Sequence, residues 1–137
     1  MSEPTAEQMR RLVHRFYERL WNTNDDDAVE STLTADFIFR GSLGEQAEGR
    51  DAWRAYRDLL RAGAADYMTD IIDLVCEPER AAARVRCSGR HTGELLGIPA
   101  TGRAFSYEVA AFFRASDGLL AVAWVLGDLD GLRAQLS

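Results

Sequence analysis

Residues 103–114, which read RAFSYEVAAFFR, decide the fold because apolar side chains recur at every second position. One face of a strand over these residues would carry Phe105, Tyr107, Val109, Ala111 and Phe113. Side chains two residues apart share a face of a β-strand, so this face is expected to line a core. The next candidate strand, residues 119–128, is largely apolar on both faces and therefore needs cover on both sides.

Two more long strand candidates, residues 67–76 and 81–92, precede this pair. Tight turns are expected at residues 77–80 and 116–118, and a longer loop at residues 93–102. The pattern predicts an antiparallel meander of four long strands in the second half of the chain. A short strand over residues 36–40 is expected earlier, closed by a glycine-bearing loop over residues 41–49.

Helices are predicted in the first half and at the end of the chain. Thr5 and Gln8 form a capping box, and apolar residues then recur at helical spacing up to Trp21. The acidic run at residues 25–27 suits the start of a second, shorter helix that runs through Leu33. A third helix is expected over residues 50–62, with Leu59 facing inward and its four arginines mostly outward. A short helix over residues 129–136 ends the chain.

These elements predict one α+β domain over residues 1–137. Three N-terminal helices are expected to pack in a strongly curved, mainly antiparallel sheet. Such a sheet would curl around the first helix and leave a cone with an internal cavity. The helices cover one face of the sheet, and we expect a second subunit to cover the other, which makes the protein a homodimer.

Composition excludes several classes of function. The chain carries a formal charge of −6 over 137 residues, and all 16 of its basic residues are arginine. An acidic chain argues against nucleic acid and anionic membranes as partners, and the lack of lysine excludes Schiff-base chemistry and a P-loop. Neither a membrane-spanning run nor a secretory signal is visible, so we expect a cytoplasmic protein. The two cysteines lack metal-ligand spacing, and no metal site is expected.

The stretch GRHTGELLGIPATG, residues 89–102, resembles the signature loop of the SnoaL-like polyketide (ester) cyclases. Other matching pieces follow in the same order, among them Phe113-Arg114 before Asp117-Gly118 and the closing segment at residues 124–136. The resemblance covers residues 5–136. It implies the cystatin-like cone of the nuclear-transport-factor-like superfamily, which is usually dimeric.

The resemblance also implies a chemistry. Ring-closing members of the family perform an intramolecular aldol reaction without metal or cofactor. This reaction removes a proton next to a carbonyl group, so it needs an acid/base group poised near neutral pH in a dry cavity. In those members an Asp on the last strand and a His on the preceding strand play this part. By the shared motifs these positions fall on Val125 and Ala111, and a polar position late in the first strand falls on Phe39.

Three residues remain as catalytic candidates, each with a structural alternative. His91 opens the signature loop and is either a base or a side chain that braces the loop. Arg40 follows an apolar strand and either binds a carboxylate or enolate oxygen or forms an ion pair at the strand end. Asp128 is either an acid/base group or the cap of the last helix.

A second set of residues is expected to contact an apolar substrate. Tyr56 and Tyr107 could polarise a carbonyl group with their hydroxyls, or could be buried with satisfied hydrogen bonds. Trp53 could equally belong to the core or an interface. The predicted substrate-binding residues are Phe16, Phe39, Trp53, Tyr56, Tyr107, Ala111 and Val125.

Three functions follow as hypotheses. The first is an enzyme that cyclises, isomerises or hydrolyses an apolar small molecule without a cofactor. The second is a non-catalytic module for hydrophobic-ligand binding or dimerisation, which the apolar residues Phe39, Ala111 and Val125 favour. The third, an enzyme resembling an epoxide hydrolase, requires two acids and one arginine, whereas only Arg40 and Asp128 suggest themselves.

Overall fold

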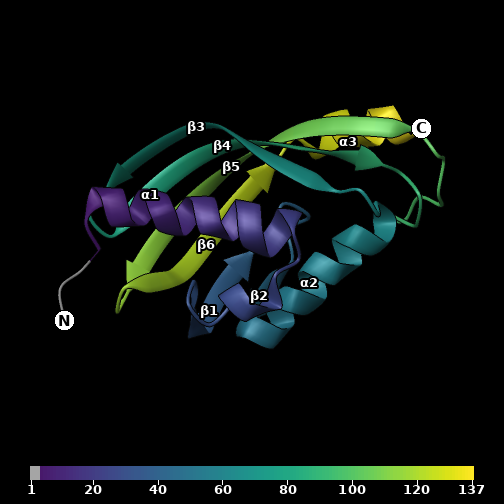
Figure 1. Ribbon diagram of the computed structural model, residues 1–137. Helices are drawn as coiled ribbons and strands as arrows, with labels where there is room; N and C mark the ends of the chain where they lie inside the picture. The colour runs from purple at the N-terminus through teal and green to yellow at the C-terminus, as the bar shows by residue number, and fades with distance from the viewer. Residues whose placement is uncertain (1–3) are drawn as a thin grey trace.

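The computed structural model describes residues 4–137 and consists of a six-stranded sheet with helices against its faces (Figure 1). The helical elements, in chain order, are α1 (Ala6–Arg15), the π-helix η1 (Phe16–Asn22), the 3-10 helix η2 (Asp26–Ala28), α2 (Arg50–Gly63) and α3 (Leu129–Leu136). The strands are β1 (Leu33–Arg40), β2 (Gln46–Glu48), β3 (Met68–Glu77), β4 (Arg80–Arg90), β5 (Ala104–Ser116) and β6 (Leu119–Gly127).

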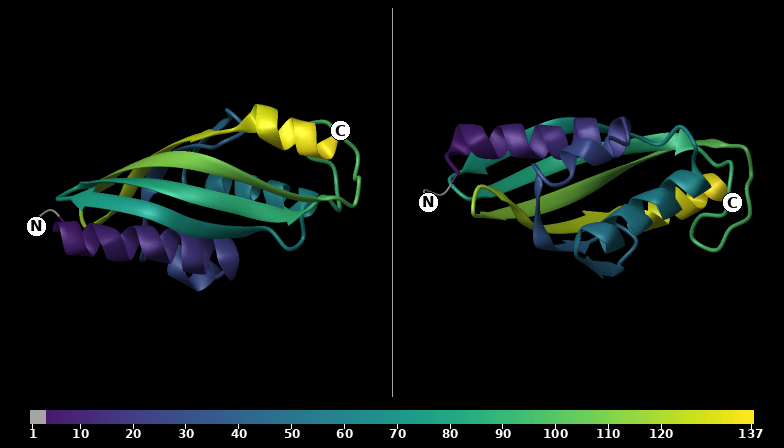
Figure 2. Two further views of the ribbon diagram at one scale, coloured as in Figure 1. Left: turned by 90° about the horizontal axis from the view of Figure 1, so that it is seen from above. Right: turned by 60° about the horizontal axis from the view of Figure 1, so that its bottom comes forward.

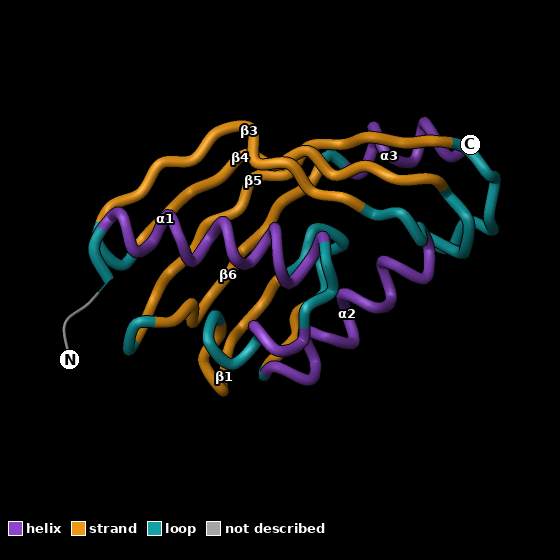
Figure 3. Tube along the Cα trace, in the orientation of Figure 1, coloured by secondary structure: helices purple, strands orange, loops and turns teal. Residues whose placement is uncertain are grey.

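The sheet has the strand order β2-β1-β6-β5-β4-β3 and is not closed. The meander β3-β4-β5-β6 is antiparallel, whereas β1 pairs with β6 in parallel. Helices and a mixed, strongly curved sheet confirm the α+β class (Figure 3). In the view from above, α1 runs along one side of the sheet and α3 lies on the other (Figure 2).

Strand alternation gives the sheet two different faces. Along β5 every second residue is buried, beginning with Phe105, as its sequence predicts. These residues face α1, η1 and α2, and we call this side the inner face. The opposite, outer face exposes a group of large apolar side chains. They are Ile38, Met68, Ile72, Val75, Phe112, Trp124 and Leu126.

The helices agree with the sequence prediction at their starts and differ in their interiors. The Thr5–Gln8 capping box is present at α1, but the helix widens to a π-helix from Phe16 onward. The second helix is a single 3-10 turn, because the chain is already extended at Leu33. On α2, Leu59 is exposed, opposite to prediction, and Arg57 is buried, whereas the other three arginines of the helix are half-buried. The short strand β2 was not predicted.

The final helix begins where β6 leaves β5. Pairing of β6 with β5 ends at Gly127 and Val109, which leaves an edge of β5 free. The side chain of Gln135 on α3 fills this edge by accepting from Ser106 N–H and donating to the Ser106 carbonyl, both at 2.8 Å. Within residues 4–137, the helices are too short or too polar to cross a membrane.

Candidate functional site

A small cavity lies between the inner face of the sheet, η1 and α2. Its volume is about 20 Å³, which is room for about one water molecule. Most of the wall is aromatic or aliphatic, and the polar part is made of hydroxyls and one thiol. The lining residues are Phe16, Tyr17, Trp21, Phe39, Ser42, Tyr56, Leu60, Tyr67, Thr69, Cys87, Val109 and Val125.

Hydrogen-bonded hydroxyls gather at this cavity. Tyr107 on β5 bonds Tyr67, which precedes β3, with 2.9 Å between the two hydroxyl oxygens. The Ser42 hydroxyl lies 3.3 Å from the same Tyr107 hydroxyl. On α2, the Tyr56 hydroxyl accepts from Leu43 N–H at 3.2 Å. Segments distant in sequence thus converge on one cluster of neutral donors and acceptors.

A glycine lets the loop after β1 reach this cluster. A Cβ atom at Gly41 would lie 2.2 Å from the Tyr56 hydroxyl oxygen and 2.1 Å from its ring. Backbone without a side chain is therefore required for the loop to pass over Tyr56. The adjacent Ser42 is then buried against Tyr107.

Burial keeps the cavity uncharged at neutral pH. Loss of solvent raises the pKa of Tyr67 and Tyr107 well above the usual range, and it raises the pKa of Tyr56 to a smaller degree. Desolvation also raises the pKa of Cys87 to about 11. A buried phenol or thiol in this state donates a hydrogen bond without carrying charge.

Three of the predicted substrate-binding residues are buried on the inner face of the sheet. Phe39, Ala111 and Val125 all face inward, and Ala111 pairs directly with Val125 across β5 and β6. Phe39 and Val125 line the cavity, as do Phe16 and Tyr56. Ala111 and Tyr107 are buried but do not line the cavity, and the Tyr107 hydroxyl is joined to it through the lining residues Tyr67 and Ser42.

Trp53 packs behind the cavity wall. Its ring meets Trp21 edge-on at 5.7 Å between centroids. Among the lining residues, the sequence prediction missed Tyr67, Cys87 and the π-helical residues Tyr17 and Trp21. Tyr67 lies two residues before Thr69 with the parity of the inner face, and this signal could have identified it.

His91 is buried within the signature loop, at 0% exposure. The backbone N–H of Thr101 donates to His91 Nδ1 at 3.2 Å, so Nδ1 is an acceptor. His91 Nε2 therefore carries the proton and donates to the Ile98 carbonyl at 3.1 Å. With both nitrogens engaged, the imidazole links the two ends of its own loop.

The loop itself is joined to the end of α2. Thr92 and Gly93 N–H groups both donate to the Gly63 carbonyl, at 3.0 and 3.1 Å. A Cβ atom at Gly93 would lie 2.1 Å from the Ala62 carbonyl oxygen, so only glycine fits at this contact.

The other two catalytic candidates lie away from the cavity. Arg40 pairs with Trp124 across β1 and β6, and its guanidinium carbon lies 5.1 Å from the Trp124 ring centre on the outer face. It also donates to the Val125 carbonyl, and among the described residues it forms no ion pair at the strand end. Asp128 is exposed and accepts from Gly131 N–H at 3.0 Å as the cap of α3. His91, Arg40 and Asp128 do not converge on one point.

The outer face carries a larger hollow, of about 530 Å³. Its lining includes the apolar residues Phe112, Trp124 and Val75 and the arginines Arg80 and Arg114. Arg84 and Arg86 lie on the same face and contact Glu108, at 3.0 and 3.9 Å. Nowhere in residues 4–137 do three or more His, Cys, Asp or Glu side chains gather as a metal site.

Comparison with known proteins gives consistent results. The family model of the SnoaL-like polyketide cyclases matches residues 11–136. The aklanonic acid methyl ester cyclase DnrD of Streptomyces peucetius is 32% identical over 110 residues, which are 78% of this chain and 75% of that protein. The structure of TsrD from Streptomyces laurentii is 32% identical, with a TM-score of 0.86 over 98% of both chains. A structure from Jannaschia sp. CCS1 has a TM-score of 0.88 at 21% identity, covers 100% and 96% of the two chains, and shows the shared fold.

Proposed function

Because the chain belongs to the SnoaL-like polyketide cyclase family, we propose that it transforms an apolar, polyketide-like carbonyl compound in its interior cavity. The reaction would be a cyclisation in the biosynthesis of a natural product, performed without a cofactor. The observation that carries this proposal is the buried Tyr67–Tyr107 hydroxyl pair beside Ser42.

The hydroxyl pair suits the electrostatic part of a ring closure. An aldol-type reaction places negative charge first on an enolate oxygen and then on the attacked carbonyl oxygen. In the Tyr67–Tyr107 pair one hydroxyl donates to the other, and the second phenolic proton, for which Ser42 lies within reach of Tyr107 at 3.3 Å, would turn to a substrate oxygen that enters the cluster. Because burial raises both pKa values, that proton stays in place at neutral pH. Such a donor stabilises charge that develops in the transition state.

The site lacks an evident strong base. Neither an Asp, a Glu nor a His occurs in the described cavity lining. By the sequence resemblance, the acid/base positions of the ring-closing members fall on Ala111 and Val125, which pair across β5 and β6. The substrate should therefore carry its own activation. A proton between two carbonyl groups is acidic enough to pass to a water molecule that enters with the substrate, and conjugation then spreads the charge of the enolate. After ring closure, the product alkoxide takes a proton back from that water. A β-keto ester fits this description.

The test uses aklanonic acid methyl ester, the compound in the name of the Streptomyces peucetius relative. We expect Tyr107→Phe to lower kcat about 100-fold, the usual cost of losing one oxyanion donor. Asp128→Asn is the control, because asparagine keeps the cap of α3 while removing the carboxylate. A large loss in Asp128→Asn with full activity in Tyr107→Phe would reverse the assignment.

A second function remains as a hypothesis, supported by the apolar residues Phe39, Ala111 and Val125. A module that shelters a hydrophobic ligand needs only a shaped apolar cavity and one or two orienting polar groups. Saturable binding of the same ester with no product would favour this function. Lack of both binding and turnover would argue against the interior cavity as the site.

We also propose that a second copy of the chain covers the outer face. Phe112 and Leu126 are 55% and 53% exposed there, and Trp124 is 42% exposed. Apolar surface of this extent marks an interface, and a face opposed to its own copy closes as a two-fold dimer. Light scattering should report a dimer for the wild type and a monomer for Phe112→Asp. Leu59→Asp, on the exposed side of α2, should stay dimeric, and a monomeric wild type would refute the proposal.

A further inference from the structure

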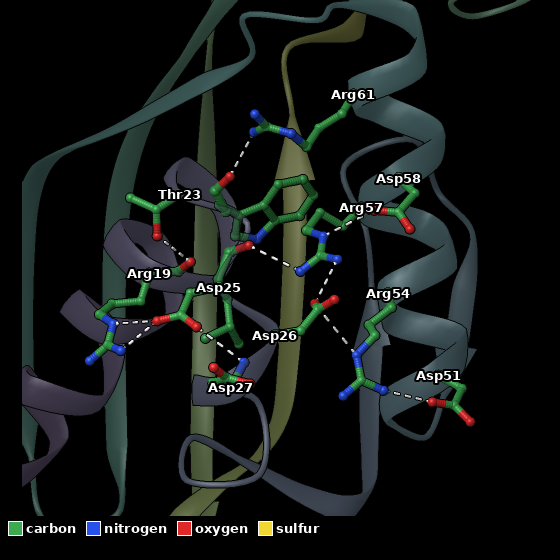
Figure 4. A network of polar contacts seen from close by, with 12 residues as sticks. Arg19, Thr23, Asp25, Asp26, Asp27, Asp51, Arg54, Arg57, Asp58 and Arg61 are labelled. Carbon is green, nitrogen blue, oxygen red and sulfur yellow. Dashed lines mark hydrogen bonds and ion pairs between the residues drawn. The ribbon is translucent and has the colours of Figure 1, made fainter.

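A network of polar groups joins the end of η1 to α2 (Figure 4). Arg57 Nη1 donates to the Leu20 carbonyl at 3.3 Å, and Arg61 Nη1 donates to the Trp21 carbonyl at 2.7 Å. Carbonyl groups at the end of a helix have no partner within it. Two arginines of α2 therefore provide the hydrogen-bond donors that these carbonyl groups lack within η1.

Arg57 is built into the core. Its side chain is 2% exposed, and its Nη2 lies 2.9 Å from the Asp26 carboxylate of η2. Its Nε lies 3.2 Å from Asp58, and its guanidinium carbon lies 5.1 Å from the centre of the Trp53 ring. A buried charge requires such compensation. Arg57 thus contacts η1, η2 and the aromatic core from one position.

The segment held in this way forms a wall of the cavity. Phe16, Tyr17 and Trp21 all come from η1. The Trp21 ring lies 5.6 Å from Tyr67 and 5.7 Å from Trp53, between centroids.

The last residue of η1 is also tied to the sheet. The Asn22 side chain donates to the Thr69 carbonyl at 2.9 Å and accepts from Thr69 N–H at 2.8 Å. The end of η1 is therefore fixed to α2 on one side and to β3 on the other.

We propose that Arg57 is a positioning residue of the interior cavity. It holds η1 in its π-helical register against α2 and controls how often this wall opens. A cavity of about 20 Å³ is far smaller than the several hundred Å³ that a ligand of this class needs. The sheet is braced by its backbone ladder, so the helical wall is the part that moves. π-Helical turns concentrate at functional sites for related reasons.

This inference rests on the proposed function for its purpose, because opening matters only if a substrate enters. The experiment that tests it measures the opening of the cavity directly and does not depend on turnover. Cys87 lines the cavity and is buried, so the rate at which its thiol reacts with methyl methanethiosulfonate reports exposure of the cavity. A Cys76→Ser background leaves Cys87 as the single thiol of the chain.

We expect Arg57→Met to speed the labelling of Cys87 about tenfold or more, since a buried carbonyl and a carboxylate lose their donor. Arg54→Met is the matched control. Arg54 lies one turn earlier on α2 and contacts Asp26 at 3.6 Å, but it donates to no carbonyl of η1. In Arg54→Met, the labelling rate of Cys87 should differ from that of the wild type by less than about twofold, because the carboxylates that Arg54 contacts are largely exposed. Arg57→Lys keeps the charge and should give an intermediate rate.

Urea separates opening of the wall from global unfolding. Local opening exposes little surface, so the accelerated labelling of Arg57→Met should depend only weakly on low urea concentrations. The proposal is overturned if Arg57→Met labels like Arg54→Met, or if its faster labelling follows global unfolding. If Arg57→Met does not fold, Arg61→Met gives the same comparison. A wild type without turnover would refute the proposed function and leave this measurement decisive.

Discussion

Replacement of His91 by alanine distinguishes a structural role from a catalytic one. The change removes the acceptor of the Thr101 N–H, whereas the Ile98 carbonyl keeps the Leu95 N–H as a donor. It also leaves a cavity in place of a fully buried imidazole. One unsatisfied N–H costs about 1–3 kcal/mol and the cavity adds to this, so we expect a loss of about 2–4 kcal/mol in the free energy of unfolding. In a domain of this size that loss lowers Tm by roughly 8–16 °C. Turnover per folded molecule should change less than about fivefold, because the imidazole lies outside the cavity lining.

The assay is urea unfolding followed by tryptophan fluorescence, with turnover measured at a temperature where the variant is folded. His14→Ala is the control, since His14 pairs only with Glu18 on an exposed helix surface. Its stability should change by less than about 0.5 kcal/mol. The structural reading is refuted if His91→Ala keeps wild-type stability while turnover falls about 100-fold.

Three further predictions concern other parts of the molecule. Gly41→Ala should destabilise the fold by about 1–3 kcal/mol and displace Tyr56, because its Cβ would overlap the ring; urea unfolding and near-ultraviolet circular dichroism would detect this. The folded-state pKa of Cys87 is raised from its usual 9.0 to about 11, so the folded state keeps a proton that the unfolded state loses. Its contribution to stability is therefore full below pH 9 and lost as pH rises toward 11, by about 2–3 kcal/mol; an alkaline unfolding series that is unchanged in Cys87→Ala would contradict this. Asp128→Ala should cost about 1 kcal/mol and Asp128→Asn a few tenths, as expected for a helix cap; equal losses in thermal unfolding would count against that role.

The order of the helices and strands could be predicted from the local sequence because each pattern is typical of one kind of secondary structure. Alternation in residues 104–116 requires a strand with one buried face, and the capping box at Thr5 requires a helix start. The pattern within residues 16–21 is equally compatible with an α-helix and a π-helix, because both bring the same apolar residues inward. The π register depends on carbonyl partners supplied by Arg57 and Arg61, which tertiary structure alone reveals.

In the candidate site, too, some features follow from the local sequence pattern and others only from the tertiary structure. Phe39, Ala111 and Val125 were placed correctly on the inner face, since parity in a regular strand is set by counting. Arg40 has the opposite parity from Phe39 and so belongs to the outer face. The sequence alone did not reveal that Tyr67 and Tyr107 meet, because 40 residues separate them and the pairing registers of β3, β4 and β5 bring them together.

The joint between Thr92-Gly93 and Gly63 has a consequence for how proteins of this kind are classified. A segment that fastens two parts of a scaffold serves the fold, whatever reaction the interior performs. Likeness within this loop therefore indicates a shared architecture and not a shared substrate. Activities are better compared through the side chains at the positions of Phe39, Ala111 and Val125, which face the interior.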